Sequence, residues 1–188
     1  AYEKQLEMKK GIVENALNRI GNQNIKVLPT IGMKDPWRYR NKGYFQVNQE
    51  KRRVRLGFYK AGSYDFVPAS GCLLFSLQIN KLLSYLEEQL SLQKVTVYNS
   101  KTREGNLRNV LIRESRNTGE IMIVFITKEN NLGLNQNILN DLVRIFPQVV
   151  SIYQNTNRSP KAVLMGKNFR LLKGKADLED AIDPFRFK

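Results

Sequence analysis

The sequence contains no histidine, and Cys72 is its single cysteine in 188 residues. Without histidine the chain cannot build a Ser–His–Asp triad, a Cys–His dyad or a self-contained zinc site. One cysteine excludes an internal disulfide framework and fits a reducing compartment, so we expect a cytoplasmic location. Glycine-rich phosphate loops of the G-x-G-x-x-G or P-loop type are also absent.

Acidic side chains and long hydrophobic runs are scarce as well. The chain has 17 acidic and 31 basic residues, a net charge of 31 − 17 = +14. The acids are scattered, so neither a paired-carboxylate hydrolase site nor a carboxylate metal cage is visible. No apolar run is long enough to span a bilayer, and no signal peptide opens the sequence. The 41% hydrophobic content is ordinary for a folded globule, and the chemistry present indicates a binding module.

Half of the excess positive charge lies in residues 34–60, read KDPWRYRNKGYFQVNQEKRRVRLGFYK. This stretch has nine Lys or Arg and two acids, a surplus of 9 − 2 = +7, with six aromatic residues between the charges. Cations bind a phosphate backbone and aromatic faces stack on bases, so the mixture predicts nucleic acid, RNA in particular. A solvated basic hairpin is the plain alternative. A surface for an acidic protein or a membrane also fits the charge, but it gives no reason for the aromatic residues.

Apolar periodicity predicts an α+β fold, with a mostly antiparallel sheet of hairpins flanked by about three helices. We expect helices at 2–20, 74–90 and 135–146, an acidic helical turn at 177–182, hairpins of 44–48 with 53–59 and of 107–114 with 120–128, and strands at 25–28, 149–154, 163–165 and 169–172. The segment 121–126 is apolar on both faces, so we expect a central strand covered by helices.

Alternation in the first hairpin separates its two faces. Val54, Leu56 and Phe58 should face the core, which places Arg53, Arg55 and Tyr59 on the outer face with Tyr44 of the partner strand. A purely solubilising face would more usually mix Lys with Glu. The candidate RNA-binding residues are Arg38, Arg40, Lys42, Tyr44, Lys51, Arg52, Arg53, Arg55 and Tyr59.

Cys72 has three interpretations from the residues alone. A half-buried structural thiol is the plain one. A nucleophile has no histidine to activate it, although an arginine or a helix N-terminus could lower its pKa. A metal ligand completed by cysteines outside the chain is the third.

Seven segments, in this order, resemble the RNA (uracil-5-)-methyltransferases, which form 5-methyluridine in transfer RNA and large-subunit ribosomal RNA. They are YEKQLEMKKGIVENALNRIG at 2–21, YRNKGYFQV at 39–47, GFY at 57–59, ASGCLL at 69–74, NLRNVLIRES at 106–115, GEIMIVFIT at 119–127 and SIYQNTN at 151–157. The resemblance covers nearly the entire chain. It implies the central domain of an enzyme with an OB-like RNA-binding domain before it and a Rossmann-like methyltransferase domain after it.

The resemblance also implies the chemistry of the longer enzyme. In iron–sulfur members three cysteines precede the Tyr-x-x-Gln-Leu segment and a fourth follows the basic hairpin, where Cys72 lies. Four thiolates hold such a cluster, so Cys72 would be one ligand of four. The family often has Pro after this cysteine, whereas this chain has Leu73.

The catalytic cysteine, the base and the S-adenosylmethionine site of the family belong to the domain beyond Lys188, so no catalytic residue is expected here. We therefore expect the RNA-binding central domain of an S-adenosylmethionine-dependent RNA (uracil-5-)-methyltransferase. Ribosomal RNA is favoured over transfer RNA, and no membrane or obligate protein partner is expected. A non-catalytic RNA- or ribosome-binding protein is the alternative.

Overall fold

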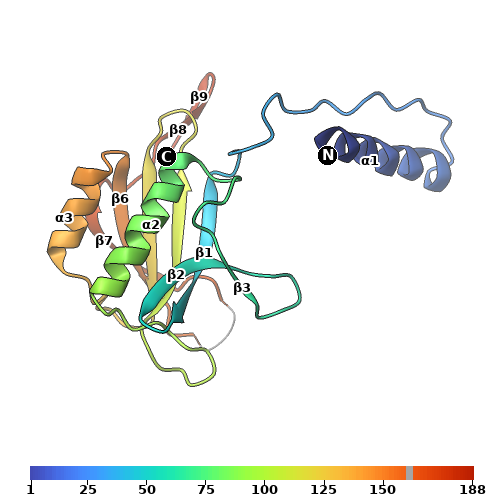
Figure 1. Ribbon diagram of the computed structural model, residues 1–188. Helices are drawn as coiled ribbons and strands as arrows, with labels where there is room; N and C mark the ends of the chain where they lie inside the picture. Colours follow the sequence, from blue (N-terminus) through green and yellow to red (C-terminus); the bar gives the residue numbers. More distant parts are fainter. Residues whose placement is uncertain (160–162) are drawn as a thin grey trace. The chain divides into compact units, whose positions relative to one another are not determined.

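The computed structural model describes residues 1–159 and 163–188 and divides the chain into two compact units (Figure 1). The first is Ala1–Tyr39 and the second is Arg40–Lys188. Each unit is described by itself.

The N-terminal unit is a helix followed by an extended return segment. The helix α1 (Tyr2–Glu14) continues into the π-helical segment η1 (Asn15–Ile20). The predicted helix at 2–20 is therefore confirmed, but its last six residues are π-helical and not α-helical. The Asn18 side chain accepts a hydrogen bond from the Ile25 N–H at 2.9 Å and donates one to the Ile25 carbonyl at 3.1 Å. This pairing occupies the backbone of Ile25, and the predicted strand at 25–28 does not form.

The second unit is built on a mostly antiparallel sheet of seven strands in the order β3-β2-β1-β4-β5-β6-β7. Its strands are β1 (Lys42–Glu50), β2 (Arg53–Tyr59), β3 (Phe66–Pro68), β4 (Leu107–Glu114), β5 (Ile121–Thr127), β6 (Val149–Thr156) and β7 (Asn168–Gly174), and a separate hairpin pairs β8 (Asp180–Ile182) with β9 (Phe185–Phe187). The two predicted hairpins are β1–β2 and β4–β5. The α+β prediction is confirmed.

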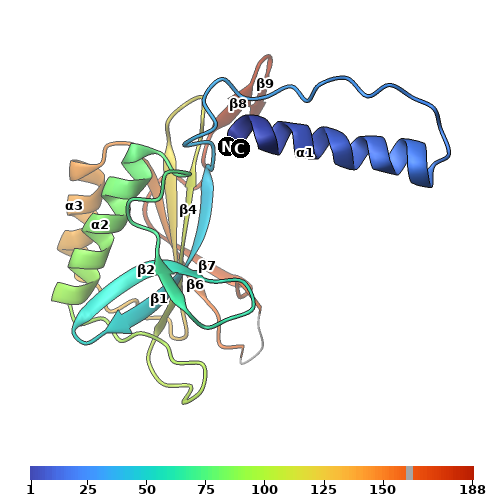
Figure 2. The same cartoon turned by 45° about the vertical axis from the view of Figure 1, so that its right-hand side comes forward.

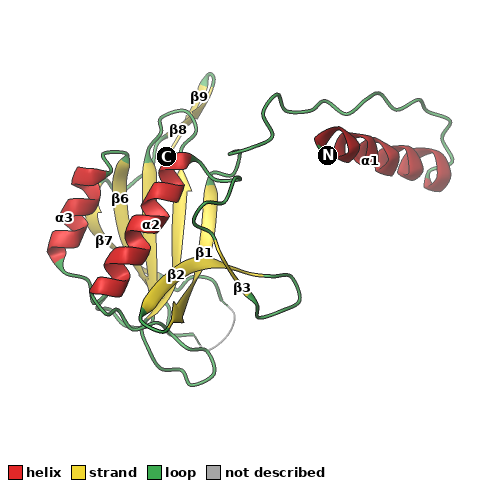
Figure 3. Cartoon of the chain, in the orientation of Figure 1, coloured by secondary structure: helices red, strands yellow, loops and turns green. Residues whose placement is uncertain are grey.

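Two helices, α2 (Leu77–Leu92) and α3 (Gln136–Ile145), lie on the same face of this sheet in both views (Figures 1 and 2). Figure 3 shows the two layers of this unit, with α2 and α3 on one side and the strands on the other. The apolar side of α2 and the inward residues of the strands form the main core. The core residues include Phe45, Leu56, Phe75, Ile79, Leu82, Leu83, Leu86, Leu90, Ile112, Ile123, Phe125 and Leu142.

The strand β5 lies between β4 and β6, so its predicted central position is confirmed. It pairs in parallel with β6, and α3 lies between these two strands in the sequence. The side chain of Asn135 caps α3 by accepting a hydrogen bond from Asn137 N–H at 3.0 Å. Helices cover only one face of β5. On the other face Val124 and Ile126 join a smaller cluster with Tyr44, Tyr153 and Met165.

Two further predicted elements are wrong, and side-chain hydrogen bonds explain both. At 163–165 no strand forms, because Asn157 Nδ2 donates to the Val163 carbonyl at 2.7 Å. At 177–182 the chain forms β8 in place of a helical turn. There Ser115 Oγ donates to Asp180 Oδ1 at 2.7 Å, and Thr118 Oγ1 donates to the Glu179 carbonyl at 2.9 Å. The Glu179 carbonyl, a backbone group that a helix would need, is therefore bound to the β4–β5 turn, and so is the Asp180 side chain.

In the described part of the chain, no helix has both the length and the apolar character needed to cross a membrane.

Candidate nucleic-acid interface

The hairpin of β1 and β2 supports most of the predicted RNA-binding residues. Its register pairs Val47 with Leu56 on the core side and Asn48 with Arg55 on the other side. Val54 and Leu56 are 2% and 0% exposed, so the predicted core face is confirmed. Because side chains alternate along a strand, the polar residues between them face away from the main core.

Four predicted cations lie exposed on this hairpin. They are Lys42, Lys51, Arg52 and Arg53. Lys51 adopts φ +58° in the two-residue connection between the strands, and Arg53 lies opposite Glu50. Lys42 lies opposite Arg113 of β4, which extends the positive charge onto the next strand. Exposed cations of this kind are available to phosphate oxygens.

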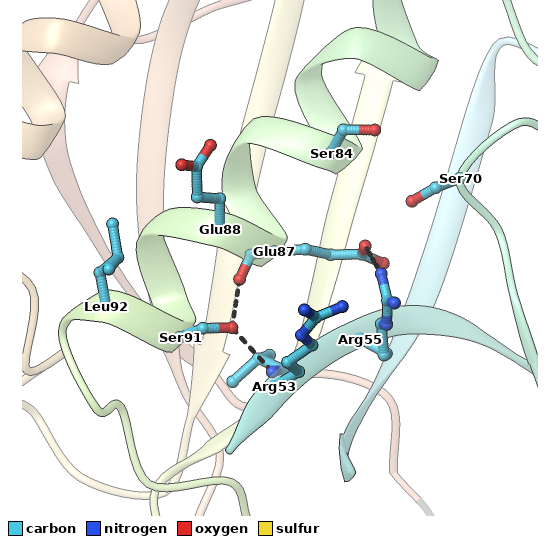
Figure 4. Close-up of a pocket in the computed structure, with 9 residues that line it drawn as sticks. Arg53, Arg55, Ser70, Ser84, Glu87, Glu88, Ser91 and Leu92 are labelled. Atoms are coloured by element: carbon cyan, nitrogen blue, oxygen red, sulfur yellow. Dashed lines mark hydrogen bonds and ion pairs between the residues drawn. The ribbon is translucent and has the colours of Figure 1, made fainter. Parts of the chain in front are cut away.

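Arg55 corrects the prediction for the outer face. Its guanidinium Nη1 lies 3.0 Å from Glu87 Oε2, and Figure 4 shows it pointing toward that carboxylate on α2. The Glu87 side chain is only 5% exposed, and its Oε1 accepts a hydrogen bond from Leu56 N–H at 2.8 Å. Arg55 therefore neutralises a buried charge on α2, and its side chain is not simply exposed on the outer face as predicted.

Arg40 and Arg38 belong to different units of the chain. The Arg40 guanidinium carbon lies 5.3 Å from the ring centre of Phe58 and 5.5 Å from that of Phe75, in cation–π contact with both. Arg40 is exposed, so its polar edge can still meet a ligand. Arg38 adopts φ +53° in the N-terminal unit and is described only there.

Tyr44 and Tyr59 have different environments. The hydroxyl of Tyr44 donates to the Leu164 carbonyl, and burial raises the pKa of Tyr44 to about 12 although Arg108 opposes the shift. Tyr59 is 44% exposed, with its ring centre 6.2 Å from Tyr64 and 5.9 Å from Phe66 in edge-to-face contacts. Tyr59 is thus part of an aromatic cluster, while Tyr44 is largely committed to the fold.

A hollow of about 550 Å³ lies beside this aromatic cluster. It is lined by Gln46, Val47, Asn48, Gln49, Tyr59, Tyr64, Phe66, Val97, Tyr98, Asn99, Ser100, Lys101, Arg108 and Asn109. Among these only Tyr59 was singled out from the sequence. The hollow also contains aromatic and basic residues of the kind that predicts RNA binding, namely Tyr64, Tyr98 and Arg108. They lie in separate segments of the sequence, and only the fold brings them together.

Cys72 lies in the turn before α2 and is half-buried against the main core. Its N–H donates to the Ala69 carbonyl at 3.0 Å, and its carbonyl accepts from Asn80 Nδ2 at 3.0 Å. Among residues 1–159 and 163–188, no group of three or more potential ligands surrounds a common point. A four-thiolate cluster does not fit this chain alone, because the sequence offers one thiol.

No family model matches the chain. It is 35% identical over 187 residues to a protein from Clostridium tetani, and 34% identical over 189 residues to one from Enterococcus faecalis. Both relatives are named uncharacterized RNA methyltransferases. All of this chain aligns in both cases, but it spans only 41% of each relative.

A solved structure is similar over the same extent. The tRNA (uracil-54, C5)-methyltransferase of Pyrococcus abyssi, in complex with S-adenosyl-L-homocysteine, aligns with a TM-score of 0.73 and 28% identity. The alignment covers 100% of this chain and 42% of that enzyme.

Proposed function

We propose that this chain, which belongs to the RNA methyltransferase family, is the RNA-binding part of a longer enzyme. That enzyme would be an S-adenosylmethionine-dependent RNA (uracil-5-)-methyltransferase. The observation that carries the proposal is homology along the whole chain to RNA methyltransferases, of which it spans about two fifths. The uracil-5 specificity is taken from the structural neighbour, whose name states that chemistry.

The surface supports a role in RNA binding. The chain has a net charge of +14, and exposed cations lie on the hairpin and its connecting turn. Lys51, Arg52 and Arg53 are consecutive and exposed, so they can follow the phosphates of one strand. Arg40 and Lys42 add exposed cations at the opposite end of the hairpin, where β1 begins.

Chemistry on the base and binding of S-adenosylmethionine are assigned to other parts of the longer enzyme. The described residues contain no histidine and no group that pairs a nucleophile with a base. For Cys72 we propose one ligand position of an iron–sulfur cluster whose three other thiolates come from outside this chain. The 188-residue chain should then purify colourless, with one thiol that reacts with a thiol reagent.

Salt dependence tests the RNA-binding role. The chain should bind both a ribosomal RNA fragment and a transfer RNA transcript, measured by fluorescence anisotropy over a salt series. Ribosomal RNA is the target favoured by the sequence, and transfer RNA is the target named for the structural neighbour, so both are included.

The variant for this test replaces Lys51, Arg52 and Arg53 together by Ala. Each phosphate contact with a single strand contributes about 0.7 to the slope of log affinity against log salt, so the slope should fall by about two units. Lys81→Ala is the control, because Lys81 is exposed on α2, away from the hairpin in sequence. Equal slopes for the parent and the triple variant would show that this charge is only a solvated surface.

A further inference from the structure

The hollow beside β1 has the size of a ligand site and two aromatic walls. Its volume of about 550 Å³ lies within the range of about 300–1,000 Å³ that small-molecule sites have. One wall is the cluster of Tyr59, Tyr64 and Phe66. The other is Tyr98 with Arg108. All of these residues belong to the second unit of the chain.

The first wall presents ring faces to solvent. Tyr59 meets Tyr64 and Phe66 at interplanar angles of 73° and 76°, in edge-to-face contacts. Such a contact covers at most one face of one of the two rings, so the opposite faces stay available for stacking. Tyr64 is 91% exposed, and its ring meets that of Tyr59. An aromatic side chain this exposed adds little to the core, which favours a role in binding.

The second wall is held in position by hydrogen bonds. The Arg108 guanidinium carbon lies 4.4 Å from the ring centre of Tyr98. Arg108 Nη1 also donates to the carbonyls of Asn157 and Ser159, at 2.9 and 2.7 Å. The loop that carries Tyr98 is fixed by the hydrogen bond from Tyr98 N–H to the Leu107 carbonyl at 2.9 Å. This wall is therefore preorganised, which lowers the entropic cost of binding.

Amide side chains also line the hollow. Asn109 Nδ2 donates to Gln46 Oε1 at 2.8 Å, and Asn109 is only 8% exposed, so this amide pair is fixed. Asn48 and Asn99 line the same hollow. Amides carry both donors and acceptors and can pair with the edges of nucleobases.

We propose that this hollow binds an unpaired nucleotide of the RNA, with its base stacked on the Tyr59–Tyr64–Phe66 wall and its edge facing the amides. Lys101 at the same hollow supplies a cation for the adjacent phosphate. The inference rests on the proposed RNA-binding function and adds to it a preference for single-stranded RNA. Bases inside a duplex are stacked on each other and cannot enter, whereas every unpaired base has a free face.

The test separates base stacking from charge. The probes are a fluorescein-labelled single-stranded oligoribonucleotide, the same oligonucleotide made abasic at its central positions, and a duplex of equal length. The variants are Tyr64→Ser, Tyr64→Phe and the control Phe169→Ser, which removes a 52% exposed ring from β7. Affinities are measured by anisotropy at one fixed salt concentration.

The expected result is a coupling between the ring and the base. Loss of a stacking partner typically costs 1–3 kcal/mol, so Tyr64→Ser should weaken binding of the intact single strand about tenfold. It should leave the affinity for the abasic strand and the duplex unchanged. Tyr64→Phe should bind like the parent, because the ring face is kept, and so should Phe169→Ser.

Two negative results have different meanings. If the parent binds the single strand but Tyr64→Ser lowers its affinity for the intact and abasic strands equally, or not at all, the hollow does not hold a base and the proposal fails. In that case the RNA-binding function itself stands. If the parent binds none of the three probes, the proposed function fails as well.

Discussion

The ion pair between Arg55 and Glu87 leads to a sharp prediction, because two neighbouring arginines of β2 have different surroundings. Arg55→Ala leaves the 5% exposed Glu87 carboxylate without its cation. Removing one partner of a buried pair costs about 3–5 kcal/mol, and the 34% exposure of Arg55 lets water reach the carboxylate and lowers this to about 2 kcal/mol. For a protein of this size, about 2 kcal/mol corresponds to a fall in Tm of about 4–8 °C.

Matched variants define the test, with thermal unfolding followed by circular dichroism. Arg53→Ala should change the free energy of unfolding by no more than about 0.5 kcal/mol, because Arg53 is exposed at the start of β2. Adding Glu87→Gln to Arg55→Ala should recover part of the lost stability. The neutral amide needs no cation, and its oxygen can still accept from Leu56 N–H. Equal Tm values for the two single arginine variants, or no relief from Glu87→Gln, would refute the argument.

Two further predictions concern β1 and β2. Val54→Asp should abolish the cooperative unfolding transition, because it places an unpaired charge at a 2% exposed position, while Gln49→Asp at the exposed position opposite should unfold like the parent. The raised pKa of Tyr44 means that the fold favours the neutral phenol, so stability present below pH 10.0 should decline as the pH rises toward about 12. Burial also raises the pKa of Tyr85, so a phenolate absorbance titration should show a late phase to which both tyrosines contribute, and Tyr44→Phe should reduce it by one group. An unchanged late phase in Tyr44→Phe would contradict the raised pKa of Tyr44.

The local parts of the fold could be predicted from the sequence. Alternation identified both hairpins and placed Val54 and Leu56 in the core. These signals depend on residues within a few positions of each other. The same is true of the helix in the N-terminal unit, although its π-helical last turn has no visible signal in the sequence.

The long-range parts could not be predicted. Alternation predicted Arg55 on the outer face, because it carries no sign of the partner Glu87, which lies 32 positions further along on a helix. The hollow likewise combines Tyr59 with Tyr98 and Arg108, which come from separate segments. Predicted elements did not form where side chains bind the backbone groups by hydrogen bonds, as Asn157 Nδ2 binds the Val163 carbonyl. Sequence periodicity carries no information on such contacts.

Glu87 and Ser91 also determine what β2 can pair with. The N–H groups of Val54 and Leu56 point to the outer edge of β2 and are bound by Ser91 Oγ at 2.8 Å and Glu87 Oε1 at 2.8 Å. The Leu56 carbonyl on that edge accepts from Ala69 N–H at 2.8 Å. A strand with free backbone groups can recruit another chain and start aggregation. In this protein the side chains of α2 block that edge, so the basic hairpin can present its charge at high concentration without templating intermolecular β-sheet.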